Sequence, residues 1–169
     1  MAEPLRPAPS QMDRAEFIAA YGGLYEHSPW IAASVYDAGL EARHDTREGL
    51  FRALSTTMLG APRAQRLALI RAHPELACSA ATALTRDSKS EQSSAGLDRC
   101  SPTELQGFAS LNREYREKFA FPFIIAVRGL DRPAILRAFT ERLANPPEAE
   151  FRIALEQINR IAWNRLEAL

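Results

Sequence analysis

The sequence predicts an all-α protein with about seven to nine helices and one extended buried segment near residues 121–128. Residues that start or stop helices recur along the whole chain, and apolar residues between them repeat every three or four positions. No series of alternating strands is visible. Of the 169 residues, 46% are hydrophobic and 25% are charged, a balance typical of a globular protein.

The first half of the chain is expected to contain helices over residues 13–21, 28–39, 46–60 and 61–72. Ser28 and Pro29 form a typical helix start, and Thr46 is expected to cap the third helix. In the fourth helix, Leu67 and Ile70 are expected to face inward. That helix has to end near residue 72, because Pro74 disfavours the helical conformation in the residue before it.

The second half begins with an irregular stretch, residues 79–100, which is rich in Ser, Thr and Asp. Ser101 and Glu104 then form a capping-box pattern that starts a helix ending near Phe119. Asp131 is expected to cap the next helix, and Pro146-Pro147 to open the last. Between them, the apolar run FAFPFIIAVRG (119–129) is expected to cross the core as an extended link rather than as a strand.

Charge and composition restrict the kinds of partner. Lys+Arg and Asp+Glu both number 21, so the formal net charge is zero, which argues against nucleic acid. No apolar run approaches the ~18–20 residues of a membrane span. Cys78 and Cys100 form neither a disulfide framework nor a C-x-x-C pair, which favours a reduced, cytoplasmic protein. Residues 1–11 are expected to be a flexible Pro/Ala-rich tail, followed by one helical domain over 12–169.

His73 is the first candidate for chemistry. It lies at the end of the fourth expected helix, where the helix dipole favours a protonated imidazole. A protonated imidazole suits a general acid working near neutral pH. The alternative is a surface histidine in a turn, and the local pattern leaves both interpretations open.

Arg165 is the second candidate, because it continues an apolar stripe on the last helix. A buried guanidinium needs a partner that offsets its desolvation. That partner is either a protein carboxylate or a substrate carboxylate held by the planar fork. Near a helix end, the side chain could also extend to water. The stripe consists of Phe151, Ala154, Leu155, Ile158, Ile161 and Ala162.

The segment SKSEQSSAGLD (88–98) is the third candidate. Glu91 and Gln92 are adjacent polar residues there, although composition alone is also typical of a solvated loop. The three histidines show no helical i, i+4 spacing and no H-E-x-x-H pattern, so no metal site is expected. No G-x-G-x-x-G or G-x-x-x-x-G-K-[ST] pattern indicates a nucleotide site.

Four motifs together resemble one family. HPELA (73–77), SxxEQxxAGL (88–97), LNxxYxxKFxFPFIIAVRG (111–129) and ALEQINRIAWNRL (154–166) are similar in order and spacing to the 2-oxo-4-hydroxy-4-carboxy-5-ureidoimidazoline (OHCU) decarboxylases of uric acid degradation. The resemblance covers roughly residues 12–169. It implies an all-helical, cofactor-free carboxy-lyase of purine metabolism, commonly a homodimer, that converts OHCU into (S)-allantoin and CO2.

The resemblance also assigns roles to residues. His73 corresponds to the proton donor of the family, and Glu91 and Arg165 to its other catalytic residues. The corresponding substrate contacts are Pro74, Ser88, Lys89, Ser90, Glu91, Gln92, Phe123, Ile124, Ile125, Ala126 and Val127. Backbone N–H groups of 123–127 suit such contacts, because an extended link has amides that no helix has used.

The chain departs from the family pattern in the loop after HPELA. This loop is slightly short, and Cys78 stands where a glycine is common, which affects the register of Ser88 more than that of Glu91. The rival interpretation is a non-catalytic helical module that binds a ureide or acts as a scaffold. Such a module is expected to have lost at least one of His73, Glu91 and Arg165, whereas this chain has all three.

Overall fold

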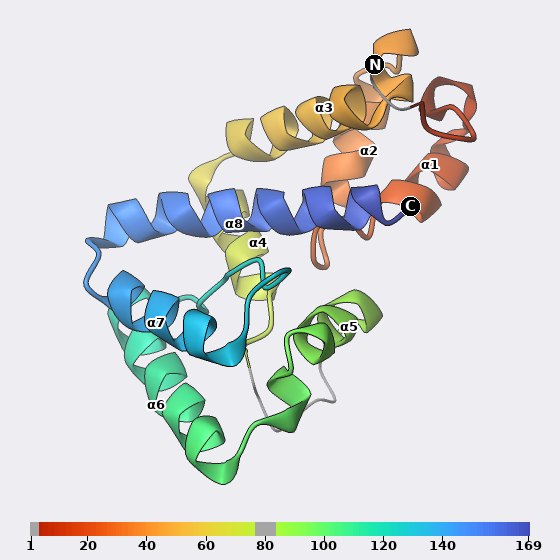
Figure 1. Cartoon of the computed structure of the whole chain (residues 1–169). Coiled ribbons are helices and arrows are strands. Elements are labelled where there is room, and N and C mark those ends of the chain that lie inside the picture. The colour runs from red at the N-terminus through yellow and green to blue at the C-terminus, as the bar shows by residue number, and fades with distance from the viewer. Residues whose placement is uncertain (1–3, 77–83) are drawn as a thin grey trace. The chain divides into compact units, whose positions relative to one another are not determined.

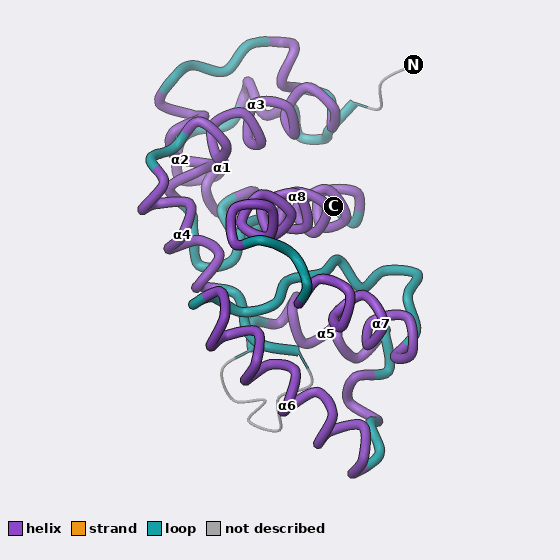
Figure 2. Tube along the Cα trace, turned by 90° about the vertical axis from the view of Figure 1, so that its left-hand side faces the viewer, coloured by secondary structure: helices purple, strands orange, loops and turns teal. Residues whose placement is uncertain are grey.

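The fold is known from a computed structural model, which describes residues 4–76 and 84–169. Over these ranges the chain forms eight α-helices and three short 3-10 helices (Figure 2). Strand-like pairing among the described residues is limited to an isolated bridge between Pro4 and Thr46. The all-α prediction is therefore confirmed. Cys78 lies outside the described residues. The α-helices are α1 (Arg14–Tyr21), α2 (Trp30–Asp37), α3 (Arg47–Gly60), α4 (Arg63–Ala72), α5 (Arg86–Ser94), α6 (Pro102–Phe119), α7 (Arg132–Leu143) and α8 (Pro147–Glu167).

The chain divides into two compact units. Unit 1 comprises Met1–Ala72 and Asn159–Leu169, and unit 2 comprises His73–Ile158. Unit 1 therefore contains α1 to α4 and the last part of α8, whereas unit 2 contains α5 to α7 and the first part of α8. That residues 12–169 form one domain stays a prediction.

In unit 1, α3 begins at its expected cap, Thr46, whereas α2 begins one residue later than Ser28-Pro29 predicts, with Pro29 at the cap position and no side-chain cap. Asp13 caps α1 in a capping box with Glu16, and the Thr46 hydroxyl accepts the Gly49 N–H at 3.2 Å to cap α3. In α4, Leu69 is buried together with Ile70, whereas the expected Leu67 is only half-buried. Residues buried completely in this unit include Phe17, Ile31, Leu50, Leu54, Met58 and Ile70.

Residues 4–11, expected to belong to a loose tail, make defined contacts within unit 1. The Leu5 N–H donates to the Asp45 carbonyl at 2.8 Å, and the Leu5 side chain is buried. Ser10 donates from both its N–H and its hydroxyl to the two Asp45 carboxylate oxygens, each at 2.8 Å. These partners lie far along the chain, so the composition of the tail alone could not reveal them.

Unit 2 differs from expectation in one element, because α5 lies within the stretch 79–100 that was expected to be irregular. Thr85 caps this helix by accepting the Ser88 N–H at 3.2 Å. The following helix, α6, begins as predicted with a capping box between Ser101 and Glu104, and Asp131 caps α7 by accepting the Ala134 N–H. Helices α6 and α7 pack against each other (Figure 1).

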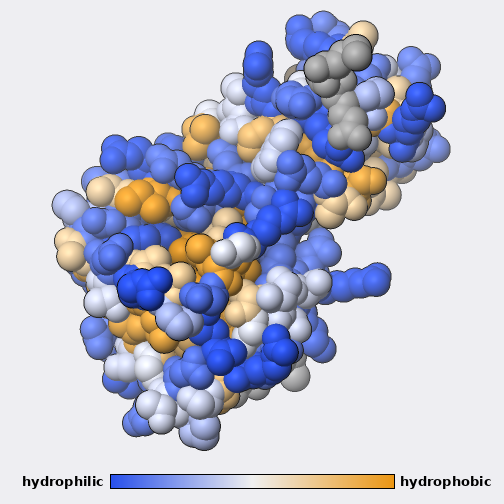
Figure 3. Space-filling view, viewed as in Figure 1, coloured by the Kyte–Doolittle hydropathy of each residue, from blue (hydrophilic) through white to orange (hydrophobic). Residues whose placement is uncertain are grey.

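The segment 122–127 joins α6 to α7 and contains neither helix nor strand. Phe123 and Ile124 are almost completely buried, at 1% and 3% exposure, so the predicted buried link is confirmed. The Phe123 ring stacks on Phe139 of α7, with ring centroids 3.8 Å apart. On the face drawn in Figure 3, hydrophobic side chains form separate patches among hydrophilic ones.

Candidate active site

His73 directly follows the last residue of α4, as Pro74 predicts, and begins unit 2. Its side chain is 7% exposed. The interpretation of His73 as a freely exposed surface residue is therefore wrong. A buried imidazole at this point has a position fixed by its surroundings, which is what a proton donor needs.

Two side-chain amides hold the residues that follow His73. The Asn112 Nδ2 of α6 donates to the Leu76 carbonyl at 2.9 Å, and the Gln92 Nε2 of α5 donates to the Glu75 carbonyl at 3.4 Å. The Glu75 carboxylate also pairs with Arg116 of α6. Helices α5 and α6 thus anchor the backbone immediately after His73-Pro74, and sequence reasoning missed Asn112 in this role.

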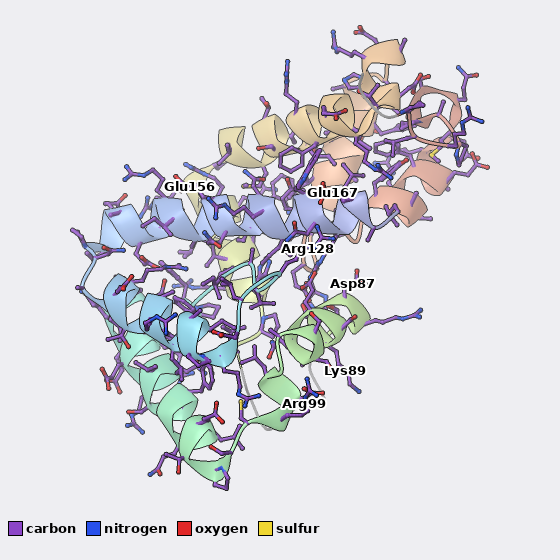
Figure 4. The ribbon with its side chains drawn as sticks, viewed as in Figure 1. Asp87, Lys89, Arg99, Arg128, Glu156 and Glu167 are labelled. Atoms are coloured by element: carbon purple, nitrogen blue, oxygen red, sulfur yellow. The ribbon has the colours of Figure 1, made fainter. Side chains whose placement is uncertain are left out.

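Helix α5 carries the predicted stretch Ser88–Gln92. Ser88 and Gln92 are buried at 5% and 9% exposure, and they are one helical turn apart on the same face. Lys89 and Ser90 are exposed, and Figure 4 labels Lys89 on this helix. Glu91 is half-buried. The helical periodicity thus turns Ser88 and Gln92 inward and Lys89 and Ser90 outward, with Glu91 at the border between the two faces.

The predicted substrate-binding segment 123–127 is held by side chains of α7 and α8. The Arg142 Nη1 donates to the Ile124 carbonyl at 2.5 Å, and the Ala126 N–H donates to the Gln157 Oε1 at 3.0 Å. Within the described residues, Ala126 has the one N–H of the segment 123–127 that is hydrogen-bonded, whereas those of Phe123, Ile124, Ile125 and Val127 have no partner. The protein therefore leaves the hydrogen-bonding capacity of these amides unused within the described residues.

A buried polar cluster stands behind this segment. Glu150 is fully buried, and its Oε1 accepts the Tyr115 hydroxyl at 2.5 Å and the Arg142 Nε at 2.7 Å. Burial, followed by the hydrogen bond to Glu150, raises the pKa of Tyr115 well above its usual value. Tyr115 thus remains a neutral hydrogen-bond donor to Glu150.

Arg165 belongs to unit 1 and is buried there, as its place on the apolar stripe predicts. Its Nη2 lies 3.0 Å from Glu26 Oε2, and the two side chains are 7% and 1% exposed. Its Nη1 donates to the carbonyls of Gly23 and Leu24 at 3.3 and 3.5 Å. Of the partners considered from the sequence, a protein carboxylate is therefore present. A guanidinium has five N–H groups, so this pairing does not prevent Arg165 from also contacting a substrate.

The chemistry of these residues is that of hydrogen bonding and proton transfer. Among residues 4–76 and 84–169, no group of three or more His, Cys, Asp and Glu side chains is arranged to hold a metal ion. In the same ranges, no helix is both long and apolar enough to cross a membrane.

Comparison with known proteins places these features in a family. The sequence profile described as OHCU decarboxylase matches residues 10–167. The chain belongs to the OHCU decarboxylase family. The resemblance seen in the four sequence motifs is thereby confirmed.

Individual relatives agree with the family match. The 2-oxo-4-hydroxy-4-carboxy-5-ureidoimidazoline decarboxylase of Halalkalicoccus jeotgali is 39% identical over 160 residues, which cover 95% of this chain and 88% of that protein. The protein of the same name from Haloferax volcanii is 37% identical over 157 residues, 93% of this chain and 90% of that one. The crystal structure of an (S)-allantoin synthase superposes with a TM-score of 0.74 at 33% identity. That match covers 95% of this chain, which spans about half of the solved chain (52%).

Within this family member, the structure groups the predicted residues by unit. His73, Pro74, the α5 residues and the segment 123–127 all belong to unit 2, whereas Arg165 belongs to unit 1. Sequence reasoning did not find the residues that hold these groups in place. They are Glu26, Asn112, Arg142, Glu150 and Gln157.

Proposed function

We propose that this protein decarboxylates OHCU to (S)-allantoin and CO2 in uric acid degradation, without a cofactor. The observation that carries the proposal is the family match over residues 10–167, together with decarboxylase relatives that are 37–39% identical over nearly the whole chain. The buried His73 and the available amides of segment 123–127 suit the chemistry of this reaction.

The site has to favour cleavage of the carboxylate bond, stabilise the enol that forms, and deliver a proton to one face of that enol. The bond between the ring carbon and the carboxylate breaks, and its electron pair enters the π-system of the ring as CO2 leaves. The enol that forms must be stabilised until a proton is added to the ring carbon that carries the ureido group. The hydroxyl proton is lost as the enol becomes a carbonyl. Proton addition on a single face then gives a single enantiomer.

In this proposal His73 donates the proton that sets the S configuration. A proton donor has to lie on one side of the substrate, and a buried histidine with an anchored backbone meets this condition. Glu91 and Gln92 hydrogen-bond the ureido N–H groups, Arg165 orients anionic or carbonyl oxygens through its planar fork, and the amides of Ile125 and Val127 bind ring oxygens. Pro74, Ser88, Lys89, Ser90, Phe123, Ile124 and Ala126 complete the proposed substrate contacts.

Two further proposals concern assembly and location. The protein is proposed to be a homodimer, as the family resemblance implies, and light scattering coupled to size-exclusion chromatography tests this assignment. A cytoplasmic location is proposed from the cysteine usage of the chain, and fractionation of the source cells tests it.

The decisive experiment follows freshly generated OHCU by circular dichroism. Spontaneous decay gives racemic allantoin, whereas catalysis by this protein is expected to give a growing signal of the S enantiomer. Heat-denatured protein provides the control. If the native protein binds allantoin but leaves the decay rate and the racemic product unchanged, the proposal fails and the chain is a non-catalytic ureide-binding module.

A further inference from the structure

The polar cluster behind the segment 122–127 links three helices of unit 2 through one buried carboxylate. It joins Tyr115 of α6, Arg142 near the end of α7 and Glu150 in the first turn of α8. Asn145, between α7 and α8, donates to the second Glu150 oxygen at 3.0 Å. The Glu150 carboxylate is fully buried, so it relies on these donors to offset the loss of water.

Arg142 connects this cluster to the segment. Its Nε and Nη2 face Glu150 Oε1 at 2.7 and 2.5 Å, while its Nη1 reaches the Ile124 carbonyl at 2.5 Å. The guanidinium carbon also lies 4.3 Å from the centroid of the Phe123 ring. A single planar group therefore fixes both a side chain and a carbonyl of the segment, and Glu150 fixes the plane of that group.

Two anchors hold successive peptide groups of the segment. Arg142 holds the Ile124 carbonyl, and Gln157 holds the Ala126 N–H. The Ile125 N–H has no hydrogen-bond partner among the described residues, and it belongs to the same planar peptide group as the Ile124 carbonyl that Arg142 holds. The direction of this amide therefore depends on the two anchors.

We propose that Arg142, oriented by Glu150, is a positioning residue that aims the backbone N–H of Ile125 at an oxygen of the substrate. The proposal rests on the proposed function of segment 123–127. Arg142 itself does not touch the substrate in this scheme. Outer residues that orient a binding group typically contribute about 10–100-fold to its effect, by analogy with residues that orient metal ligands.

The test compares two substitutions in the same cluster. Arg142→Lys keeps a positive charge for Glu150 but lacks the planar fork that reaches Glu150 and Ile124 together. Tyr115→Phe removes one hydrogen bond to Glu150, keeps the aromatic ring, and leaves the Ile124 anchor intact. Arg137→Lys makes the same chemical change as the first variant at an exposed position of the same helix, and serves as the control.

We expect Arg142→Lys and Tyr115→Phe both to lower the melting temperature, and only Arg142→Lys to lower kcat/KM for OHCU, by about 10–100-fold at a temperature where every variant is folded. The loss is expected mainly in KM, since the Ile125 amide binds an oxygen that the substrate already carries. If Arg142→Lys keeps kcat/KM within about twofold of Arg137→Lys, or if Tyr115→Phe loses as much as Arg142→Lys, the positioning role is refuted.

Hydrogen exchange of a peptide covering 123–127 tests the same idea without turnover. Exchange in this peptide is expected to be faster in Arg142→Lys than in Tyr115→Phe and Arg137→Lys, because only the first variant loosens the Ile124 anchor. Equal exchange in all three variants contradicts the proposal. An inactive wild type with the expected exchange pattern refutes the proposed function while supporting the role of Arg142 in holding the segment.

Discussion

Replacing Glu26 by Gln tests what holds Arg165 in unit 1. The two side chains are almost completely buried and their charged atoms are 3.0 Å apart. Removing one partner of a buried ion pair typically costs about 3–5 kcal/mol, because the other charge stays buried without compensation. Gln keeps an oxygen that accepts an N–H, so we expect the lower end, about 3 kcal/mol. For a protein of this size, that corresponds to a fall in melting temperature of about 6–12 °C.

Thermal unfolding followed by far-ultraviolet circular dichroism measures this effect. Glu41→Gln is the matched control, because Glu41 pairs with Arg43 at the same distance of 3.0 Å but both side chains are more than half exposed (62% and 68%). Water and salt screen such a pair, and it typically adds about 0–1 kcal/mol to the free energy of unfolding. We expect the control to melt within about 3 °C of the wild type.

The two outcomes of this comparison are distinct. If Glu26→Gln melts as close to the wild type as Glu41→Gln does, the argument from burial is refuted. Activity gives separate information, because Glu26 also orients the guanidinium. If Arg165 contacts the substrate, kcat/KM of the folded Glu26→Gln variant should fall by about 10–100-fold. An unchanged kcat/KM together with a lowered melting temperature would assign Arg165 a structural role only.

Three further predictions concern unit 2. His73→Asn should lose about 10²–10⁴-fold in OHCU turnover, measured by circular dichroism, because it lacks the proton donor; near wild-type turnover would exclude the assigned role. Asn112→Ala leaves the buried Leu76 carbonyl without its donor, which should cost about 1–3 kcal/mol and lower the midpoint of chemical denaturation. The Ser101 N–H and Arg132 lower the pKa of Glu104 below its ordinary value of 4.5. The ionised carboxylate therefore stabilises the fold above pH 4.5, and this stabilisation is lost as the pH falls through the lowered pKa. Glu104→Gln lacks this contribution, so its melting temperature should fall less between neutral and acidic pH than that of the wild type.

The sequence predicts most helices because their starts carry local chemistry. Ser101 with Glu104, Asp131 and Thr46 cap helices where the pattern indicates, since a cap depends on residues only three positions apart. Helix α5 was missed because its sequence, RDSKSEQSS, has no apolar residue that reveals a helical period. The local signals were its cap, Thr85, and Gly96, which follows the helix in a left-handed conformation.

The candidate site was predictable where one residue carries its own signal. His73 is marked by the proline that follows it, and the burial of Arg165 by the apolar stripe. The residues that hold these two regions in place were not predictable in this way. Glu26 meets Arg165, and Asn112 meets the Leu76 carbonyl after His73, only through the tertiary fold. The burial of Glu150 does have a signal in the sequence, because Glu150 precedes Ala154 and Ile158 at intervals of four on the same inward stripe of α8.

Helix α8 carries three polar side chains that each hold a partner elsewhere in the fold, and this limits where residues can be inserted into the helix or deleted from it. Glu150, Gln157 and Arg165 lie along one continuous helix of 21 residues, about 30 Å long. Inserting one residue between Gln157 and Arg165 would rotate Arg165 by about 100° around the helix axis relative to Glu150 and Gln157. The number of residues between these groups therefore fixes the directions in which their side chains leave the helix. Changes in chain length that preserve the spacing of these three groups are confined to positions before Glu150 or after Arg165.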